Sequence, residues 1–148
     1  MLGIKIQDTK PSAGGTGILS FDLRDILAAI GEPVRLSQWR CHDLRYTAEK
    51  DGKFYEFRER RRRCNGQDMI EFAAGVLQTI DGRFSAQSPG AAKKPWIIIL
   101  AVDSSWFEVW STKPQVIAKL AERFAKVSEL SSTAAEHVVG PARGERVL

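Results

Sequence analysis

The sequence predicts an α+β fold, a two-layer sandwich in which an antiparallel sheet of about four to five strands carries helices mainly on one face. The strongest observation is a hairpin pattern followed by a helix pattern. Residues 96–102 (WIIILAV) and 106–112 (WFEVWST) are short apolar runs typical of strands, and residues 103–105 (DSS) suit the turn between them. A capping-box pair and an apolar stripe at helical spacing follow: Thr112 and Gln115, then Val116, Ile117, Leu120, Phe124 and Val127.

A second hairpin followed by a helix lies earlier in the chain. The elements expected there are strands over residues 36–47 and 53–58 and a helix over residues 69–80. The pair Asp51-Gly52 favours a turn, Asn65 with Asp68 resembles a helix cap, and Gly82 favours a stop. The two hairpin units match poorly in loop length and charge. A plain two-layer domain is therefore preferred to an internal duplication, which stays open.

The remaining signals define the domain organisation. Ser20 is the expected N-cap of a helix over residues 21–30, and residues 82–87 suit one more short strand. We expect three parts: a loosely ordered N-terminal arm at 1–19 with a short strand over 2–7, a single α+β domain at 20–130, and a disordered tail at 131–148.

Composition indicates an ordinary globular protein. The chain has 148 residues, of which 43% are hydrophobic and 27% are charged. Its longest apolar run, residues 96–102, is far shorter than the roughly 20 residues that span a bilayer, and the first residues lack the apolar region of a signal peptide. Two cysteines, Cys41 and Cys64, are too few for a disulfide framework. We therefore expect a cytoplasmic protein without a membrane partner.

Positive charge is concentrated in one part of the chain. Residues 35–63 hold ten basic and five acidic residues, a net charge of +5, whereas the rest of the chain carries −1. The candidate binding residues are Arg58, Arg60, Arg61, Arg62 and Arg63, which could attract phosphate groups. The competing interpretation is a solvated loop that keeps the protein soluble. Arg35, Arg40 and Arg45 should not extend the site, because a spacing of five places alternate residues on opposite faces of a strand.

A second candidate surface consists of the tryptophans of the last hairpin. Trp106, Glu108 and Trp110 share one face of their expected strand, and Phe107 and Val109 share the other. If helices cover the Phe107 face, the tryptophans could form a protein-binding patch or a platform for stacked bases. Alternatively, the face is ordinary core, covered by another part of the chain or by a second copy in a homodimer.

Signals for cofactors and metals are weak. The glycine cluster at residues 14–17 (GGTG) lacks the Lys-Ser/Thr pair and the tight turn of a phosphate-binding loop. Cys41 and His42 are neighbours that point to opposite faces of a strand, and Cys64 adds no paired-cysteine spacing, so zinc is not expected. His137 lies in the expected tail. We expect no cofactor.

Four carboxylates leave a remote enzymatic alternative. Asp81 and Asp103 are at the ends of expected elements, and Glu56 and Glu108 are in the middle of expected strands. If they converge, they could bind a divalent metal and support a phosphodiesterase or nuclease, although acidic residues at turns are usually turn formers.

The sequence thus predicts a non-enzymatic protein that acts by binding a macromolecule. The first hypothesis is a protein-interaction or self-associating module that uses Trp106 and Trp110. The alternative is a nucleic-acid-binding protein that uses the basic segment from Arg58 to Arg63.

Overall fold

The computed structural model describes residues 1–11, 17–88, 90 and 94–131. The expected tail lies outside the described residues except for Ser131, as do Gly14, Gly15 and His137. The elements, in chain order, are β1 (Leu2–Ile6), α1 (Leu23–Ile30), α2 (Glu32–Arg35), β2 (Gln38–Lys50), β3 (Lys53–Asn65), α3 (Gly66–Gly75), β4 (Val76–Gln87), β5 (Ile97–Val102), β6 (Trp106–Ser111), α4 (Pro114–Arg123) and β7 (Val127–Leu130). None of these helices is long and apolar enough to cross a membrane.

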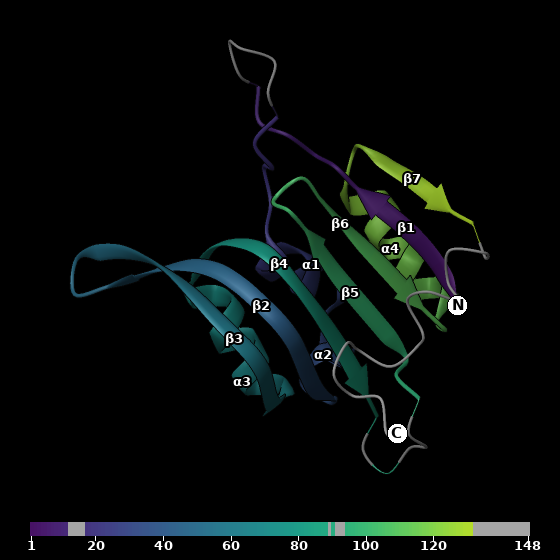
Figure 1. Cartoon of the computed structure of the whole chain (residues 1–148). Coiled ribbons are helices and arrows are strands. Elements are labelled where there is room, and N and C mark those ends of the chain that lie inside the picture. Colours follow the sequence, from purple (N-terminus) through teal and green to yellow (C-terminus); the bar gives the residue numbers. More distant parts are fainter. Residues whose placement is uncertain (12–16, 89, 91–93, 132–148) are drawn as a thin grey trace, which may run out of the picture.

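The described strands form one open antiparallel sheet in the order β3-β2-β4-β5-β6-β1-β7 (Figure 1). The α+β class and the antiparallel sheet are confirmed, but the sheet has seven strands instead of the expected four to five. Strand β1 confirms the short strand expected over residues 2–7, and it is hydrogen-bonded on both sides, to β6 and to β7. Strand β7 is the one that the sequence analysis does not predict, because Val127 fits the period of the preceding helix.

Both hairpins are present, and the first has the turn that its residues predict. Asp51 and Gly52 both have positive φ angles, 54° and 76°, and Lys50 pairs directly with Lys53. Two positive φ angles in a two-residue loop match the twist of a hairpin, and an Asp-Gly pair adopts them readily. The strands of this hairpin are longer than expected, so that the whole arginine run lies within β3 instead of in a loop.

Two predicted helices end earlier than their apolar spacing suggests. Helix α3 ends at Gly75, and Val76 and Ile80 belong to β4, where Val76 pairs with Ala48 of β2. These residues fit the helical period, but β-branched side chains also suit a strand, and pairing with β2 decides the outcome. Helix α4 ends at Arg123, and Val127 begins β7. The expected helices over 69–80 and through 127 are therefore too long.

Of the three expected helix N-caps, the structure confirms one. Asn65 caps α3, and its side chain accepts a hydrogen bond from the Asp68 N–H as expected. Asp22, not Ser20, caps α1, because it forms a capping box with Asp25. The predicted Thr112 cap is wrong, since the N-cap of α4 is Lys113, which makes no side-chain cap bond.

The main core lies between the helices and one face of the sheet (Figure 1). Helix α1 contributes four buried side chains to it, and Phe107 and Val109 of β6 lie in the same cluster, as predicted. The ring of Phe21 joins the layers, with its centroid 5.4 Å from that of Phe107 and 4.9 Å from that of Phe124. The other face of the sheet is called the open face below.

One buried carboxylate connects α1 to the sheet. Asp22 accepts hydrogen bonds from the Leu23 N–H (2.6 Å), the Thr79 N–H (2.8 Å) and the Thr79 hydroxyl. Burial raises the pKa of Asp22, and the hydrogen bonds from Thr79 and Leu23 oppose that rise. A single side chain therefore satisfies a helix terminus and a β4 residue at once.

We expect Asp22→Ala to destabilise the fold by about 2–3 kcal/mol, because it removes a helix cap and leaves the buried Thr79 donors without an acceptor. Asn65→Ala is the matched control and should cost about 1 kcal/mol, because Asn65 accepts only the Asp68 bond of an exposed cap. Urea unfolding followed by tryptophan fluorescence measures both. Equal losses would contradict a role for Asp22 beyond capping.

Candidate functional site

A β-bulge in β2 determines which side chains reach the open face. The pairing of β2 with β4 shifts between His42 and Arg45, and Asp43 in between has a positive φ angle of 51°. Cys41, before the bulge, and Leu44, after it, are both buried in the core on the helix side of the sheet. Buried residues normally alternate with a spacing of two along a strand, so the spacing of three shows that one extra residue is inserted here.

The bulge brings Arg40 and Arg45 onto the same face. Arg40 lies beside the core residues Trp39 and Cys41, and Arg45 lies between Leu44 and Tyr46, so both point away from the helices. The expectation that a spacing of five would separate them is wrong for this pair, because the inserted residue restores the alternation. The only sign in the sequence was an aspartate inside a strand pattern, a residue type that strands disfavour and that tolerates positive φ.

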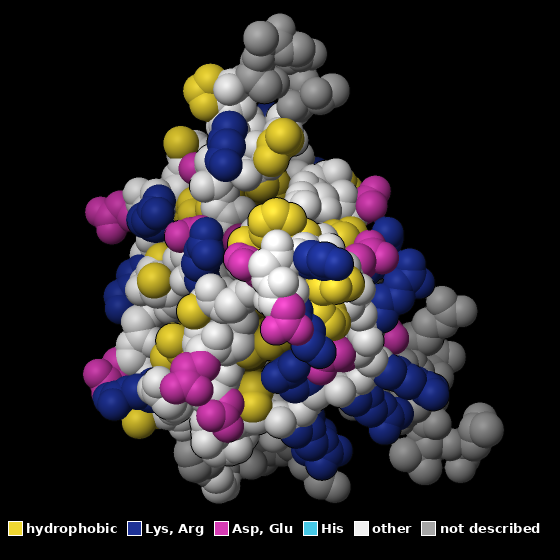
Figure 2. Space-filling view, turned by 90° about the vertical axis from the view of Figure 1, so that its left-hand side faces the viewer, with side chains coloured by type: hydrophobic (Ala, Val, Ile, Leu, Met, Phe, Trp, Pro, Cys, Tyr) yellow, Lys and Arg dark blue, Asp and Glu magenta, His cyan; other side chains and the backbone are white. Residues whose placement is uncertain are grey.

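Strand β3 follows β2 in continuous register and adds its own arginines to this face. Arg63 lies directly opposite Arg40, Arg61 opposite His42, and Arg58 opposite Arg45. Directly opposed residues of an antiparallel pair share a face. On the other side of β2, Arg83 of β4 also lies opposite His42. We call this surface the arginine face and define it by Arg40, Arg45, Arg58, Arg60, Arg61, Arg63 and Arg83. Figure 2 looks onto the β3 edge and shows Lys and Arg side chains gathered at its lower right, on the side of the open face.

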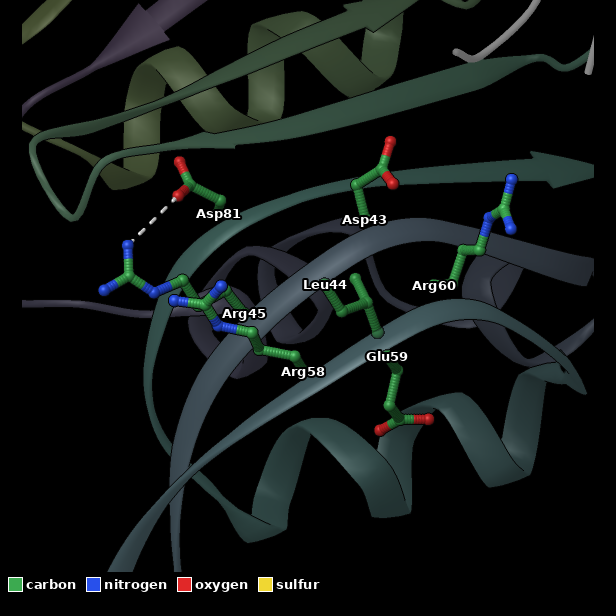
Figure 3. A pocket seen from close by; sticks show the side chains of 7 residues that line it. All are labelled: Asp43, Leu44, Arg45, Arg58, Glu59, Arg60 and Asp81. Carbon is green, nitrogen blue, oxygen red and sulfur yellow. Dashed lines mark ion pairs between the residues drawn. The ribbon is translucent and has the colours of Figure 1, made fainter. Parts of the chain in front are cut away.

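A hollow of about 970 Å³ lies at the bulge (Figure 3). Its lining residues are Asp43, Leu44, Arg45, Arg58, Glu59, Arg60 and Asp81. Figure 3 shows Asp43 and Arg60 pointing away from α3, whereas Glu59 points towards it. The hollow therefore offers guanidinium groups from two strands to a ligand on the open face.

Carboxylates neutralise only part of the arginine face. Arg45 Nε lies 2.8 Å from Glu56 Oε1, and Arg45 Nη1 lies 3.9 Å from Asp81 Oδ2. Arg58 Nη2 lies 3.8 Å from the same Glu56 side chain. Other arginines of the face have no ion-pair partner among the residues that the structure describes: Arg40, Arg60 and Arg63. The face thus keeps an excess of positive charge.

Arg62, which the sequence grouped with its neighbours, faces the helices instead. Its guanidinium carbon lies 4.1 Å from the centroid of the Phe72 ring, and its Nη2 donates to Glu59 Oε2 at 2.8 Å. The Tyr46 hydroxyl donates to the same carboxylate. Burial and the Glu59 carboxylate raise the pKa of Tyr46 to about 12. These contacts connect α3 to the β2–β3 hairpin. Arg62 therefore does not belong to the arginine face.

Trp106 and Trp110 lie on the open face of β6, but they offer little surface. Trp110 is 0% exposed, and its ring covers Gly3, where any Cβ would come within 2.4 Å of the ring. Trp106 is partly exposed, with the Lys5 ammonium 4.2 Å from its ring centroid. Both indole N–H groups donate to Glu108, at 3.1 Å and 3.3 Å. Trp110 thus belongs to a small buried cluster with Ile98. This agrees with the alternative that this face is ordinary core covered by another part of the chain.

The four candidate carboxylates do not come together. Glu56 and Asp81 both contact Arg45, and Asp81 Oδ1 accepts from the Asp103 N–H at 2.8 Å, whereas Glu108 binds the two indoles. Within the described ranges, no group of three His, Cys, Asp or Glu side chains is arranged to hold a metal ion. The two cysteines are free thiols, and burial raises the pKa of each.

Comparison with known proteins gave no relative, since no protein-family model, no curated protein and no solved structure matches the chain.

We expect the left-handed backbone at Asp43 to make this position sensitive to side-chain shape. Asp43→Val should destabilise the fold by about 1–2 kcal/mol, because a β-branched residue is strained at positive φ, whereas Asp43→Gly should be neutral or stabilising. Thr47→Val in the same strand is the control and should change stability by less than about 0.5 kcal/mol. Thermal unfolding compares the three variants, and a harmless Asp43→Val would contradict the bulge.

We expect Glu59 to contribute to stability in a pH-dependent way. Burial alone would raise the pKa of Glu59, but the hydrogen bonds from Arg62 and Tyr46 and the Arg62 charge hold it below its usual 4.5. The stability from this group is therefore complete above pH 4.5 and is lost as the pH falls through the lowered folded-state pKa. Glu59→Gln should destabilise the fold at pH 7 and lose less on acidification than the wild type. Urea unfolding midpoints measured at pH 7 and at an acidic pH below 4.5 test this expectation. Glu49→Gln, which changes an exposed carboxylate, is the control.

Proposed function

We propose that this protein binds nucleic acid through the arginine face. The observation that carries the proposal is the direct cross-strand opposition of Arg40 with Arg63, which have no ion-pair partner among the described residues. Arg45 and Arg58 are opposed in the same way, but Glu56 contacts both of them. Directly opposed like charges destabilise a sheet. A bound polyanion would relieve this repulsion, because guanidinium groups form paired hydrogen bonds with phosphate oxygens and remain charged at every working pH.

The spacing of the charges favours a polymer over a small anion. Arg58 and Arg63 are five residues apart on β3, which at about 3.3 Å per residue separates them by roughly 16 Å. One phosphate group cannot contact both ends of such a row, whereas a phosphodiester chain can. Each neutralised phosphate also releases condensed counterions, which gives affinity without requiring a particular base sequence.

The other hypotheses have less support. A protein-interaction or self-associating module that uses Trp106 and Trp110 would need an accessible pair of rings, and Trp110 is buried. A metal-dependent hydrolase would need converging carboxylates, and the described residues include no group of three His, Cys, Asp or Glu side chains arranged to hold a metal ion. Pairing through the β3 edge is disfavoured by its arginines, since charged edge strands resist strand addition. We place the protein in the cytoplasm, where its two thiols would stay reduced.

We expect the double variant Arg40→Ser/Arg63→Ser to weaken binding of a labelled mixed-sequence oligonucleotide by at least about 10-fold at low salt. The slope of log affinity against log salt should fall by about 1–2, because up to two phosphate contacts are lost. Fluorescence anisotropy at several salt concentrations measures both quantities.

The matched control removes the same charge elsewhere. Arg24→Ser/Arg123→Ser alters exposed residues of α1 and α4, outside the open face, and should leave the slope unchanged. Equal losses in the two double variants would show that only net charge matters. No binding by the wild type at low salt would refute the proposed function.

A further inference from the structure

We infer that the nucleic acid is single-stranded and that one of its unpaired bases stacks on Phe54 at the tip of the β2–β3 hairpin. This inference rests on the proposed function and specifies its ligand.

Phe54 is exposed to a degree that packing does not explain. Its side chain is 72% exposed, the largest fraction among the exposed large hydrophobic residues that the structure describes. The hairpin that carries it extends beyond the helices (Figure 1). Neighbouring aromatic residues behave differently, because Phe57 stacks on Tyr46 with centroids 5.5 Å apart, and Tyr55 contacts Phe57. No ring contact of Phe54 is found in the described part of the chain.

Strand alternation places Phe54 on the arginine-face side of β3. Glu56 lies two residues further on and contacts both Arg45 and Arg58. Tyr55 and Phe57 point to the opposite face, where Phe57 stacks on Tyr46 and Tyr46 contacts Phe72 of α3. The exposed ring and the guanidinium row therefore face the same side.

Cations on the same face lie on one side of this ring. Lys50 and Lys53 are directly opposed beside the turn, but strand alternation directs them to the other face, and Arg45 and Arg58 are opposed five residues further along each strand. The distance from Phe54 to Arg58 is about 13 Å along the strand. A strand that runs along the arginine face towards the tip can thus place a phosphate at Arg58 and a base on Phe54.

Aromatic stacking selects unpaired bases. Every base has a π-face that can lie on an aromatic ring, so such a contact tolerates any sequence, but inside a duplex both faces of a base are covered by its neighbours. A basic groove that follows the backbone, combined with an aromatic ring for stacking, is the usual combination in proteins that bind single strands. Phe54 and the arginine face provide both features on one surface.

The test compares a labelled 20-nucleotide single strand with its blunt duplex at equal phosphate concentration, using anisotropy. We expect the wild type to prefer the single strand. Phe54→Ala should weaken single-strand binding by about 5- to 100-fold and leave duplex binding within about twofold. Tyr55→Ala removes an exposed ring from the opposite face and should change neither affinity.

A conservative variant separates stacking from structural damage. Phe54→Trp should retain single-strand affinity, and its added indole should be quenched more by the single strand than by the duplex. Unchanged single-strand affinity in Phe54→Ala would overturn the stacking inference and leave the proposed function intact. Duplex preference that Phe54→Ala abolishes would also overturn it, in favour of a hairpin inserted into a duplex groove. Absence of binding to either probe would refute the proposed function itself.

Discussion

The one-residue insertion at Asp43 is the constraint on which both faces of the first hairpin depend. It lets Cys41 and Leu44 point into the same core, and it lets Arg40 and Arg45 share the opposite face. Because β3 stays in register with β2 through the bulge, the change of alternation is passed to the neighbouring strand. The separation of Glu59 and Arg62, which face α3, from the exposed arginines follows from the same insertion. One left-handed residue thus divides a continuous basic sequence into a part that packs against α3 and a part on the open face.

Elements specified by local signals could be predicted from the sequence. The hairpin of β5 and β6 combines two short apolar runs with turn residues, and the Asp51-Gly52 turn has the chemistry that its φ angles require. Elements specified by partners could not. Val76 and Ile80 fit a helical period as well as a strand, and only their pairing with β2 assigns them to β4. Likewise, Val127 fits the period of the expected helix, and only its pairing with Ile6 of β1 assigns it to β7.

The candidate site was predictable in composition but not in geometry. The arginine run was visible as a local excess of charge, yet the period of a strand could not show that Arg62 turns inwards, because the alternation depends on a bulge defined by β4. Trp110 was assigned to the correct face, but its burial depends on Gly3, which reaches it through β1. Phe54 carried no distinguishing signal, since exposed and buried aromatic residues look alike in a strand of mixed composition.

The position of β1 between β6 and β7 has a consequence for how the chain acquires its structure. Gly3 pairs with Trp110, so β1 has no partner until almost all of the domain has been synthesised. Helix α1 and the β2–β3 hairpin can form from contacts between residues close in sequence. The pairing of β1 with β6 and β7 instead requires the whole chain between β1 and β6 to be brought together first. During translation, the segment that contains the apolar residues Ile4 and Ile6 therefore stays unpaired until β6 and β7 have been made. Completion of the sheet is therefore a late event, and until then this apolar segment is open to aggregation or to binding by chaperones.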